Sequence, residues 1–80
     1  MRLPRDLAGA DLAKALGRLG YETTRQTGSH LRLTTQLEGE HHITIPRHGP
    51  VKVGTLAAIL NEVAHHAGVT RREVLARLFL

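Results

Sequence analysis

Apolar residues recur along this chain with two different periods, and the changes of period divide the chain into elements. From Ala8 to Leu19 the apolar positions are three or four residues apart, a spacing that places them on one face of a helix. Gly20 follows and favours the left-handed backbone that ends helices. The same spacing returns from Lys52 to Ala64, and Gly68 marks its end. We therefore predict two amphipathic helices, whose apolar positions are Ala8, Leu12, Ala15, Leu16, Leu19, Val53, Leu56, Ala57, Leu60, Val63 and Ala64.

Between these helices the period changes to strict alternation of apolar and polar residues. Residues 30–34 place two leucines on one face and polar side chains on the other, and residues 42–46 do the same with two isoleucines. Residues 21–26 are rich in strand-forming side chains and end at Thr27-Gly28, which is a tight-turn signal. The segment predicts three strands in a meander.

The alternation also predicts the register of the second and third strands. Leucines and isoleucines share the core face only if Leu33 lies opposite Ile43, and this pairing places His30 opposite Pro46. His48 is then the diagonal neighbour of His30. The two helices should cover one face of the sheet, and the other face should be open, with the polar residues His30, Arg32, Thr34, His42 and Thr44.

A third, shorter helix is predicted after Gly68. Thr70 and Glu73 have the spacing of a capping box, and an apolar stripe follows from Val74 to Phe79. The expected fold class is α+β, with the order α-β-β-β-α, a three-stranded antiparallel sheet and an extra C-terminal helix. We expect a single domain over residues 1–80, with its core in residues 8–66 and a C-terminal helical extension in residues 70–80.

Composition narrows the classes of function. Lys and Arg together number 11 against 7 Asp and Glu, which gives a formal net charge of +4 and favours polyanionic partners such as nucleic acid. The absence of cysteine excludes disulfides, thiolate catalysis and cysteine zinc sites. Charged residues near the N-terminus do not form a signal peptide, and no segment has the length of a membrane span. A cytoplasmic location without membrane association is expected.

The basic residues near the predicted sheet end suit RNA chemistry without a metal. Such cleavage needs a base for the 2′-hydroxyl proton, an acid for the departing 5′-oxygen, and cations for the phosphorane charge. Histidine titrates near neutrality, so His30 is the candidate proton-transfer residue. Gly28 permits close backbone approach, and Ser29 is a donor to a phosphate oxygen. Further candidates for phosphate contact or for the second acid are Arg25, Arg47, His48 and Lys52.

The pattern alone leaves the ordinary alternative open, because a histidine at a strand start is usually a plain exposed residue. The other histidines have structural interpretations. His41 and His42 are adjacent on a strand and point to opposite faces, so they do not readily chelate one ion. His65 and His66 lie in the last turn of a helix, where the dipole favours positive charge. We expect neither a metal site nor a cofactor.

Four blocks of residues resemble those of a known family. They are Leu-Gly-Tyr-Glu at 19–22, Arg-Gln-Thr-Gly-Ser-His at 25–30, Ile-Pro-Arg-His at 45–48, and Lys-Val-Gly-Thr-Leu at 52–56, the last followed by Ile59 and Leu60. In this order, over roughly residues 9–60, the chain resembles the HicA (YcfA-like) toxins. The resemblance implies a fold like that of double-stranded-RNA-binding domains and an mRNA interferase activity that does not need the ribosome. It also implies that His30, in the Gly-Ser-His step, is the essential histidine.

The resemblance further implies a HicB-type antitoxin that binds the toxin, masks its active site and represses the operon. The longer region from Asn61 to Thr70 and the third helix depart from compact members of the family. The leading hypothesis is therefore the toxin of a type II toxin-antitoxin system, acting as a metal-independent mRNA interferase. The alternative is a non-catalytic RNA-binding or antitoxin-interaction module. Expected partners are mRNA and the antitoxin, in a homo-oligomer or a toxin-antitoxin hetero-oligomer.

Overall fold

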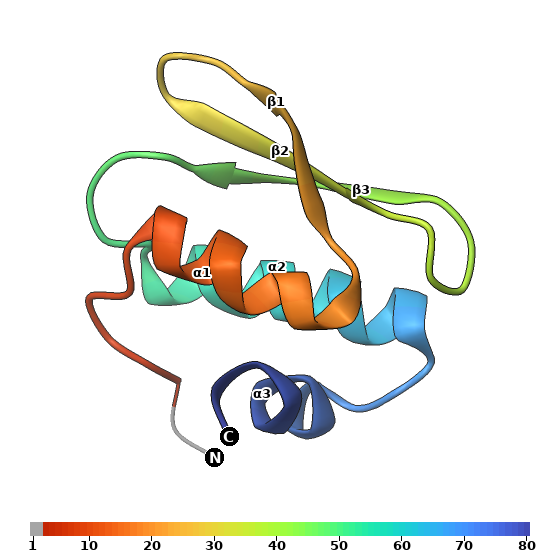
Figure 1. Ribbon diagram of the computed structural model, residues 1–80. Helices are drawn as coiled ribbons and strands as arrows, with labels where there is room; N and C mark the ends of the chain where they lie inside the picture. Colours follow the sequence, from red (N-terminus) through yellow and green to blue (C-terminus); the bar gives the residue numbers. More distant parts are fainter. Residues whose placement is uncertain (1–2) are drawn as a thin grey trace.

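The computed structural model describes residues 3–80 and has an α+β fold, as predicted (Figure 1). The strands form one antiparallel sheet in the order β1-β2-β3. Helix α1 precedes the strands, α2 follows them and α3 ends the chain, which confirms the predicted order. The elements are α1 (Gly9–Leu16), the 3-10 turn η1 (Gly17–Leu19), β1 (Glu22–Gln26), β2 (His30–Thr35), β3 (His41–Pro46), α2 (Val53–Ala67) and α3 (Arg71–Phe79).

The predicted register between β2 and β3 is confirmed. Leu33 pairs with Ile43, and His30 pairs with Pro46. The connecting loop turns through Glu38 and Gly39, whose φ angles of 57° and 94° are left-handed. The leucines of β2 and the isoleucines of β3 therefore share the buried face, and the intervening polar residues lie on the other face.

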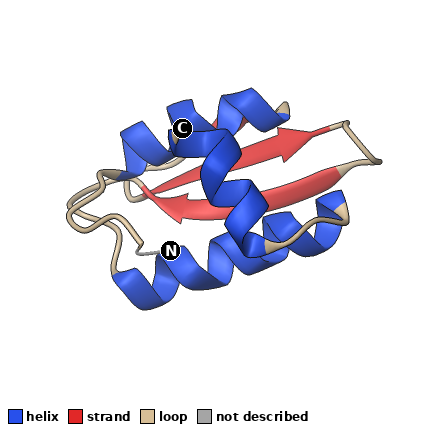
Figure 2. Cartoon of the chain, turned by 90° about the horizontal axis from the view of Figure 1, so that it is seen from below, coloured by secondary structure: helices blue, strands red, loops and turns tan. Residues whose placement is uncertain are grey.

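The helices form two further layers on the buried side of the sheet. Helices α1 and α2 lie directly against the sheet, and α3 crosses them on their far side (Figures 1 and 2). Val74 and Leu75 of α3 are almost completely buried in the same core as the leucines of β2. The predicted extension is thus packed into the body of the domain and contributes to its core.

Side chains and left-handed residues define the ends of the helices. Gly20 and Gly68 have φ angles of 83° and 71°, as expected for residues that end helices. Helix α2 ends at Ala67, directly before Gly68, as the sequence predicts. At the start of α3 the Glu73 backbone N–H donates to Thr70 Oγ1 at 3.1 Å, which is one half of the predicted capping box.

Strand β1 contains an irregularity that alternation did not predict. Thr23 pairs with Leu33 and Arg25 pairs with Arg32, so Thr24 is an extra residue in the β1–β2 ladder. This β-bulge changes which face the later residues of β1 occupy.

Within residues 3–80, no helix is both long and apolar enough to cross a membrane.

Candidate functional site

An open groove lies on the sheet face that no helix covers. Its lining comes from all three strands and from the turn between β1 and β2: Arg25, Thr27, His30, Arg32 and Thr44. Alternation along β2 and β3 directs His30, Arg32 and Thr44 to this face, because the leucines and isoleucines between them point into the core. The groove therefore combines one imidazole, two guanidinium groups and two hydroxyl groups.

The β-bulge accounts for the position of Arg25 in the groove. Thr24 already points to the open face, because its Oγ1 lies 2.9 Å from Oγ1 of Thr34 on β2. Strict alternation would then turn Arg25 toward the helices. The extra residue instead brings Arg25 opposite Arg32, on the same face as Thr24.

His30 begins β2 at the end of a closed turn. Its backbone N–H donates to Thr27 Oγ1 at 3.1 Å, and the Thr27 N–H donates to the His30 carbonyl oxygen at 2.9 Å. The Ser29 hydroxyl lies 3.1 Å from His30 Nδ1. Nε2 of this exposed ring has no hydrogen-bond partner among the residues that the structure describes. One ring nitrogen thus bonds to Ser29, and the other is left without a partner in the part of the chain that the structure describes.

The segment after β3 holds this turn from the other side. His48 Nε2 donates to the Gly28 carbonyl oxygen at 2.6 Å, and the Arg47 backbone N–H donates to the Ser29 carbonyl oxygen at 2.9 Å. His48 does not line the groove. It contacts the Gly28-Ser29-His30 step through the backbone of Gly28.

The two remaining predicted residues lie outside the groove. The Arg47 guanidinium donates to the Thr27 carbonyl oxygen at 3.4 Å from Nη1, and it faces the side chain of Gln26. With the Gln26 amide oxygen turned toward it, that oxygen accepts from Nη1, Nη2 and Nε at 3.1, 2.9 and 3.1 Å. Arg47 thereby lines a different groove, beneath β1 and beside Lys14 of α1. Lys52 is the exposed N-cap residue of α2 and lines neither groove.

Arg32, Thr44 and Thr27 line the groove although they were not among the predicted site residues. The signal for Arg32 and Thr44 was present in the sequence, because alternation had already assigned both to the open face. Position on that face alone did not separate groove residues from others. Thr34 and His42 lie on the same face but outside the groove, where they bond to each other at 2.7 Å.

The other polar residues of the open face bond to one another near the β2–β3 loop. His42 Nε2 lies 3.3 Å from a carboxylate oxygen of Glu40, and the Gln36 amide donates to that carboxylate at 3.3 Å. The hydrogen bond from Gln36 and then that from His42 hold the pKa of Glu40 below its usual range. Across residues 3–80 no group of three or more His, Cys, Asp or Glu side chains is arranged to hold a metal ion.

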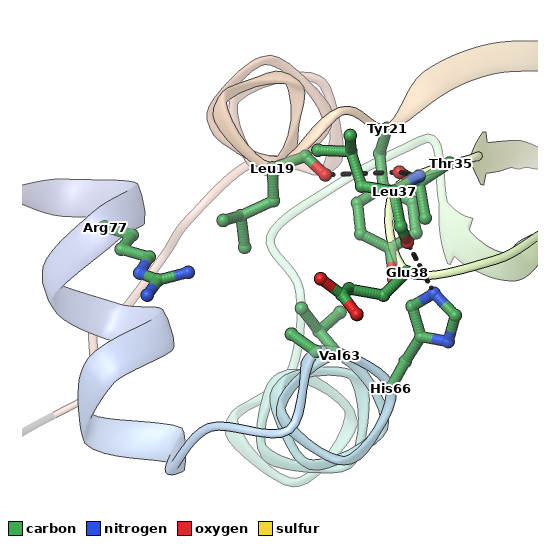
Figure 3. Close-up of a pocket in the computed structure, with 9 residues that line it drawn as sticks. Leu19, Tyr21, Thr35, Leu37, Glu38, Val63, His66 and Arg77 are labelled. Carbon is green, nitrogen blue, oxygen red and sulfur yellow. Dashed lines mark hydrogen bonds between the residues drawn. The ribbon is translucent and has the colours of Figure 1, made fainter.

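A cavity of about 200 Å³ lies at the opposite end of the sheet, between the β2–β3 loop, α2 and α3 (Figure 3). His66 from α2 spans its edge, where Nε2 donates to the carbonyl oxygens of Leu37 and Gly39 at 2.9 and 3.1 Å. The His66 ring stacks on that of His41 at 4.4 Å, and His41 Nδ1 bonds to the Tyr21 hydroxyl at 2.8 Å. Periodicity did not predict this cluster. Its side chains bond mainly within the protein, so the open groove is the better candidate site.

Comparison with protein families identifies the family of this chain. Residues 9–68, three quarters of the chain, match the family described as "HicA toxin of bacterial toxin-antitoxin". The chain belongs to the HicA toxin family. The match includes every residue of the groove and leaves α3 outside it. No match is found among curated proteins or among solved structures.

Membership of the HicA family confirms the resemblance and assigns the chain to the toxins of bacterial toxin-antitoxin systems. It also implies an antitoxin partner.

Proposed function

We propose that this HicA-family toxin is a metal-independent endoribonuclease that cleaves mRNA in the open groove, with His30 as the residue that transfers protons. The observation that carries the proposal is the setting of His30 Nε2. This atom is exposed and unbonded among the described residues, in a groove that also holds the guanidinium groups of Arg25 and Arg32.

The reaction that fits these groups is transesterification within the RNA strand. A base takes the proton from a 2′-hydroxyl, and the 2′-oxygen forms a bond to the adjacent phosphorus. The bond from phosphorus to the 5′-oxygen breaks, and an acid gives that oxygen a proton. The products are a 2′,3′-cyclic phosphate and a 5′-hydroxyl. This step consumes no water and requires no metal ion. The negative charge that develops on the phosphorane is stabilised by cations.

His30 can serve at either proton-transfer position because of its contact with Ser29. A hydroxyl both donates and accepts, so the Ser29 hydroxyl can bond to His30 Nδ1 in either neutral tautomer. With the proton on Nδ1, Nε2 accepts a proton from the 2′-hydroxyl. With the ring protonated, Nε2 gives a proton to the 5′-oxygen. In both cases Ser29 keeps the ring oriented toward the groove.

The remaining predicted residues support the same site in different ways. Gly28 leaves open space beside the turn, because a Cβ built at this position meets nothing within 4 Å. An RNA backbone therefore can approach this turn closely. His48 holds the turn, and Arg47 and Lys52 add positive charge around it. A HicB-type antitoxin that covers the groove would keep both RNA and solvent away from His30.

The test is paired induction in bacteria of the wild type and of His30→Ala, with RNA recovered from the same cells. The wild type should stop growth and deplete mRNA, and His30→Ala should do neither. His65→Ala is the matched control, because His65 is an exposed histidine on α2 that lies outside the groove. Purified protein should cut RNA in the presence of EDTA and leave 2′,3′-cyclic phosphate ends.

The outcomes separate this proposal from its alternatives. Full toxicity of His30→Ala would remove the catalytic role of His30. Salt-dependent binding of RNA by the purified wild type without any cleavage would indicate a non-catalytic RNA-binding module. Failure both to bind and to cut RNA, with retained binding to the antitoxin, would indicate an interaction module.

A further inference from the structure

Arg25 and Arg32 occupy directly paired positions on β1 and β2 and face the same open groove. Like charges directly opposite each other on one sheet face are destabilising. Within residues 3–80 neither guanidinium has a carboxylate within ion-pair distance, since the one ion pair found there joins His42 and Glu40. The fold therefore holds two positive charges together without a negative charge of its own between them.

Glu40 is the carboxylate whose pKa responds to Arg32, and this influence is small. Its pKa is lowered first by the hydrogen bond from Gln36, next by His42, and least by the positive charge of Arg32. The Glu40 carboxylate is thus already bonded to Gln36 and His42. Both guanidinium groups are left available to an anion from outside the chain.

A specific backbone feature produces this pair of charges. Without the bulge at Thr24, Arg25 would point toward the helices and Arg32 would face the groove alone. Bulges occur often beside active sites, where they redirect a side chain. Here the bulge brings a second guanidinium into the groove that contains His30.

The geometry points to a phosphate clamp, in which Arg25 and Arg32 together bind one backbone phosphate of single-stranded RNA beside His30. The clamp rests on the proposed function, because it binds the substrate of that same site. Guanidinium groups bind phosphate oxygens through paired N–H donors, and one phosphate between them removes the repulsion of the two charges. The hydroxyls of Thr27 and Thr44 in the same groove supply further donors to the strand.

The open face favours recognition of the backbone over recognition of bases. Proteins that bind single strands through a sheet commonly stack bases on aromatic side chains. This chain has one Tyr and one Phe, and neither lies on the open face. The aromatic rings on that face are the imidazoles of His30 and of His42, and His42 is bonded to Thr34 and Glu40. Tyr21 is buried on the helix side, and Phe79 belongs to α3. Contacts to phosphate should therefore dominate the affinity and make it strongly dependent on salt.

The test measures binding of a 2′-O-methyl RNA oligonucleotide, which the proposed reaction does not cut, by fluorescence anisotropy at several salt concentrations. The variants are Arg25→Gln, Arg32→Gln and the double variant. Each single variant should lose about tenfold in affinity, which is the size of a charge-assisted hydrogen bond. The double variant should reduce the slope of log affinity against log salt by about 0.7, the value for one phosphate of a single strand. Arg32→Lys should recover part of the affinity, because it keeps the charge but not the paired donors.

Arg18→Gln is the matched control. It removes the same charge from an exposed arginine on η1, on the helix side of the molecule. Affinity of Arg32→Gln equal to that of Arg18→Gln would overturn the clamp and would leave the two arginines to an acidic protein partner. A slope reduced by about 1.4 in the double variant would also overturn it, because two separate phosphates would then be bound. Circular dichroism of each variant confirms that the fold is retained.

These results are separable from those for cleavage, because the oligonucleotide is not a substrate. A wild type that binds it through both arginines but never cuts RNA would refute the nuclease and retain the clamp. A wild type that cuts RNA, with Arg32→Gln binding and cutting equally well, would refute the clamp and retain the nuclease. A wild type that does not bind the oligonucleotide would refute the clamp.

Discussion

His48 Nε2 donates a hydrogen bond of 2.6 Å to the carbonyl oxygen of Gly28, and so joins the segment after β3 to the turn that presents His30. The two residues are 20 positions apart in the chain. The bond acts on the backbone of the turn, one residue before Ser29 and two before His30. His48 can therefore influence the proposed reaction without entering the groove.

His48→Ala should lower the rate of RNA cleavage by about tenfold, because a lost hydrogen bond of this kind is worth about 1 kcal/mol and misplacement of the turn adds to it. His48→Gln should restore part of the rate, since its amide N–H can donate to the same carbonyl. The informative measurement is the pH profile of the cleavage rate. If His48 only positions the turn, the profile of His48→Ala keeps its shape at a lower height. The loss of one limb of the profile would show that His48 itself transfers a proton.

Two glycine substitutions should differ in their effect on stability. A Cβ at Gly9 would overlap the Pro46 carbonyl oxygen, where the start of α1 lies against the end of β3, so Gly9→Ala should destabilise the fold by about 1–3 kcal/mol. A Cβ at Gly28 meets no atom of the protein, and Gly28→Ala should change stability by less than about 0.5 kcal/mol.

Cleavage by Gly28→Ala should nevertheless fall, if the RNA backbone approaches the turn as proposed. Urea unfolding of both variants gives the stabilities, and a cleavage assay under folded conditions gives the activities. A Gly28→Ala protein that is as active as the wild type would show that the substrate does not need the space beside Gly28.

The fold was largely predictable because its signals are local. Alternation of apolar residues along β2 and β3 fixes the inward face, and this face in turn determines that His30 lies opposite Pro46. Helix spacing and the end glycines Gly20 and Gly68 predict the helices to within about one turn. The apolar stripe of α3 predicts that this helix packs against an apolar surface, but the sequence did not show whether that surface was the core or a partner.

The site was less predictable because it depends on one extra residue and on contacts between distant positions. Nothing in the run of residues 22–26 indicates that Thr24 is the extra residue in the ladder, so the sequence did not place Arg25 opposite Arg32. Arg47 was expected beside His30, but its guanidinium turns toward Gln26 and the helix side. The His41–His66 stack joins residues 25 positions apart that no periodicity relates.

Mild acid should destabilise the fold through His41. Burial chiefly lowers the pKa of His41, with further lowering from the charges of His66 and His42 and an opposing effect of Glu62. A histidine whose pKa is lower in the folded state contributes full stability above its usual value of 6.5, and this stability is lost as the pH falls through the lower folded value. The melting temperature should therefore fall between pH 7.5 and pH 5.

The control is His65→Gln, which changes an exposed histidine next to His66 and should keep the acid dependence of the wild type. His41→Gln should flatten the dependence of the melting temperature on pH. An equally steep dependence in His41→Gln would assign the acid sensitivity to another group.

Tyr21 should produce the opposite dependence at high pH. Burial, and then the negative charge of Glu62, raise its pKa from 10.0 to about 12. A raised phenol pKa stabilises the folded state fully below the usual value of 10.0, and this stability is lost as the pH rises toward about 12. Tyr21 is the single tyrosine of the chain, so the absorbance of its phenolate reports on this residue alone. The midpoint should lie near 12 in the folded protein and near 10 in urea, and a midpoint near 10 in both would refute the burial effect.

Arg32→Gln should make the unliganded protein more stable while it weakens RNA binding. The paired positions of Arg25 and Arg32 hold two like charges opposite each other, an arrangement that costs about 0.2–1 kcal/mol in a sheet. Removal of one charge should raise the free energy of unfolding by about this amount at low salt. The gain should shrink near 1 M salt, where charges on the surface are screened over about 3 Å.

Arg18→Gln should show no comparable gain, because Arg18 lies on η1, away from the sheet. Equal stability changes in the two variants would mean that repulsion between Arg25 and Arg32 does not lower the free energy of unfolding. A selective gain for Arg32→Gln would show that the groove keeps a charge that stability alone disfavours, as expected for a residue retained for binding.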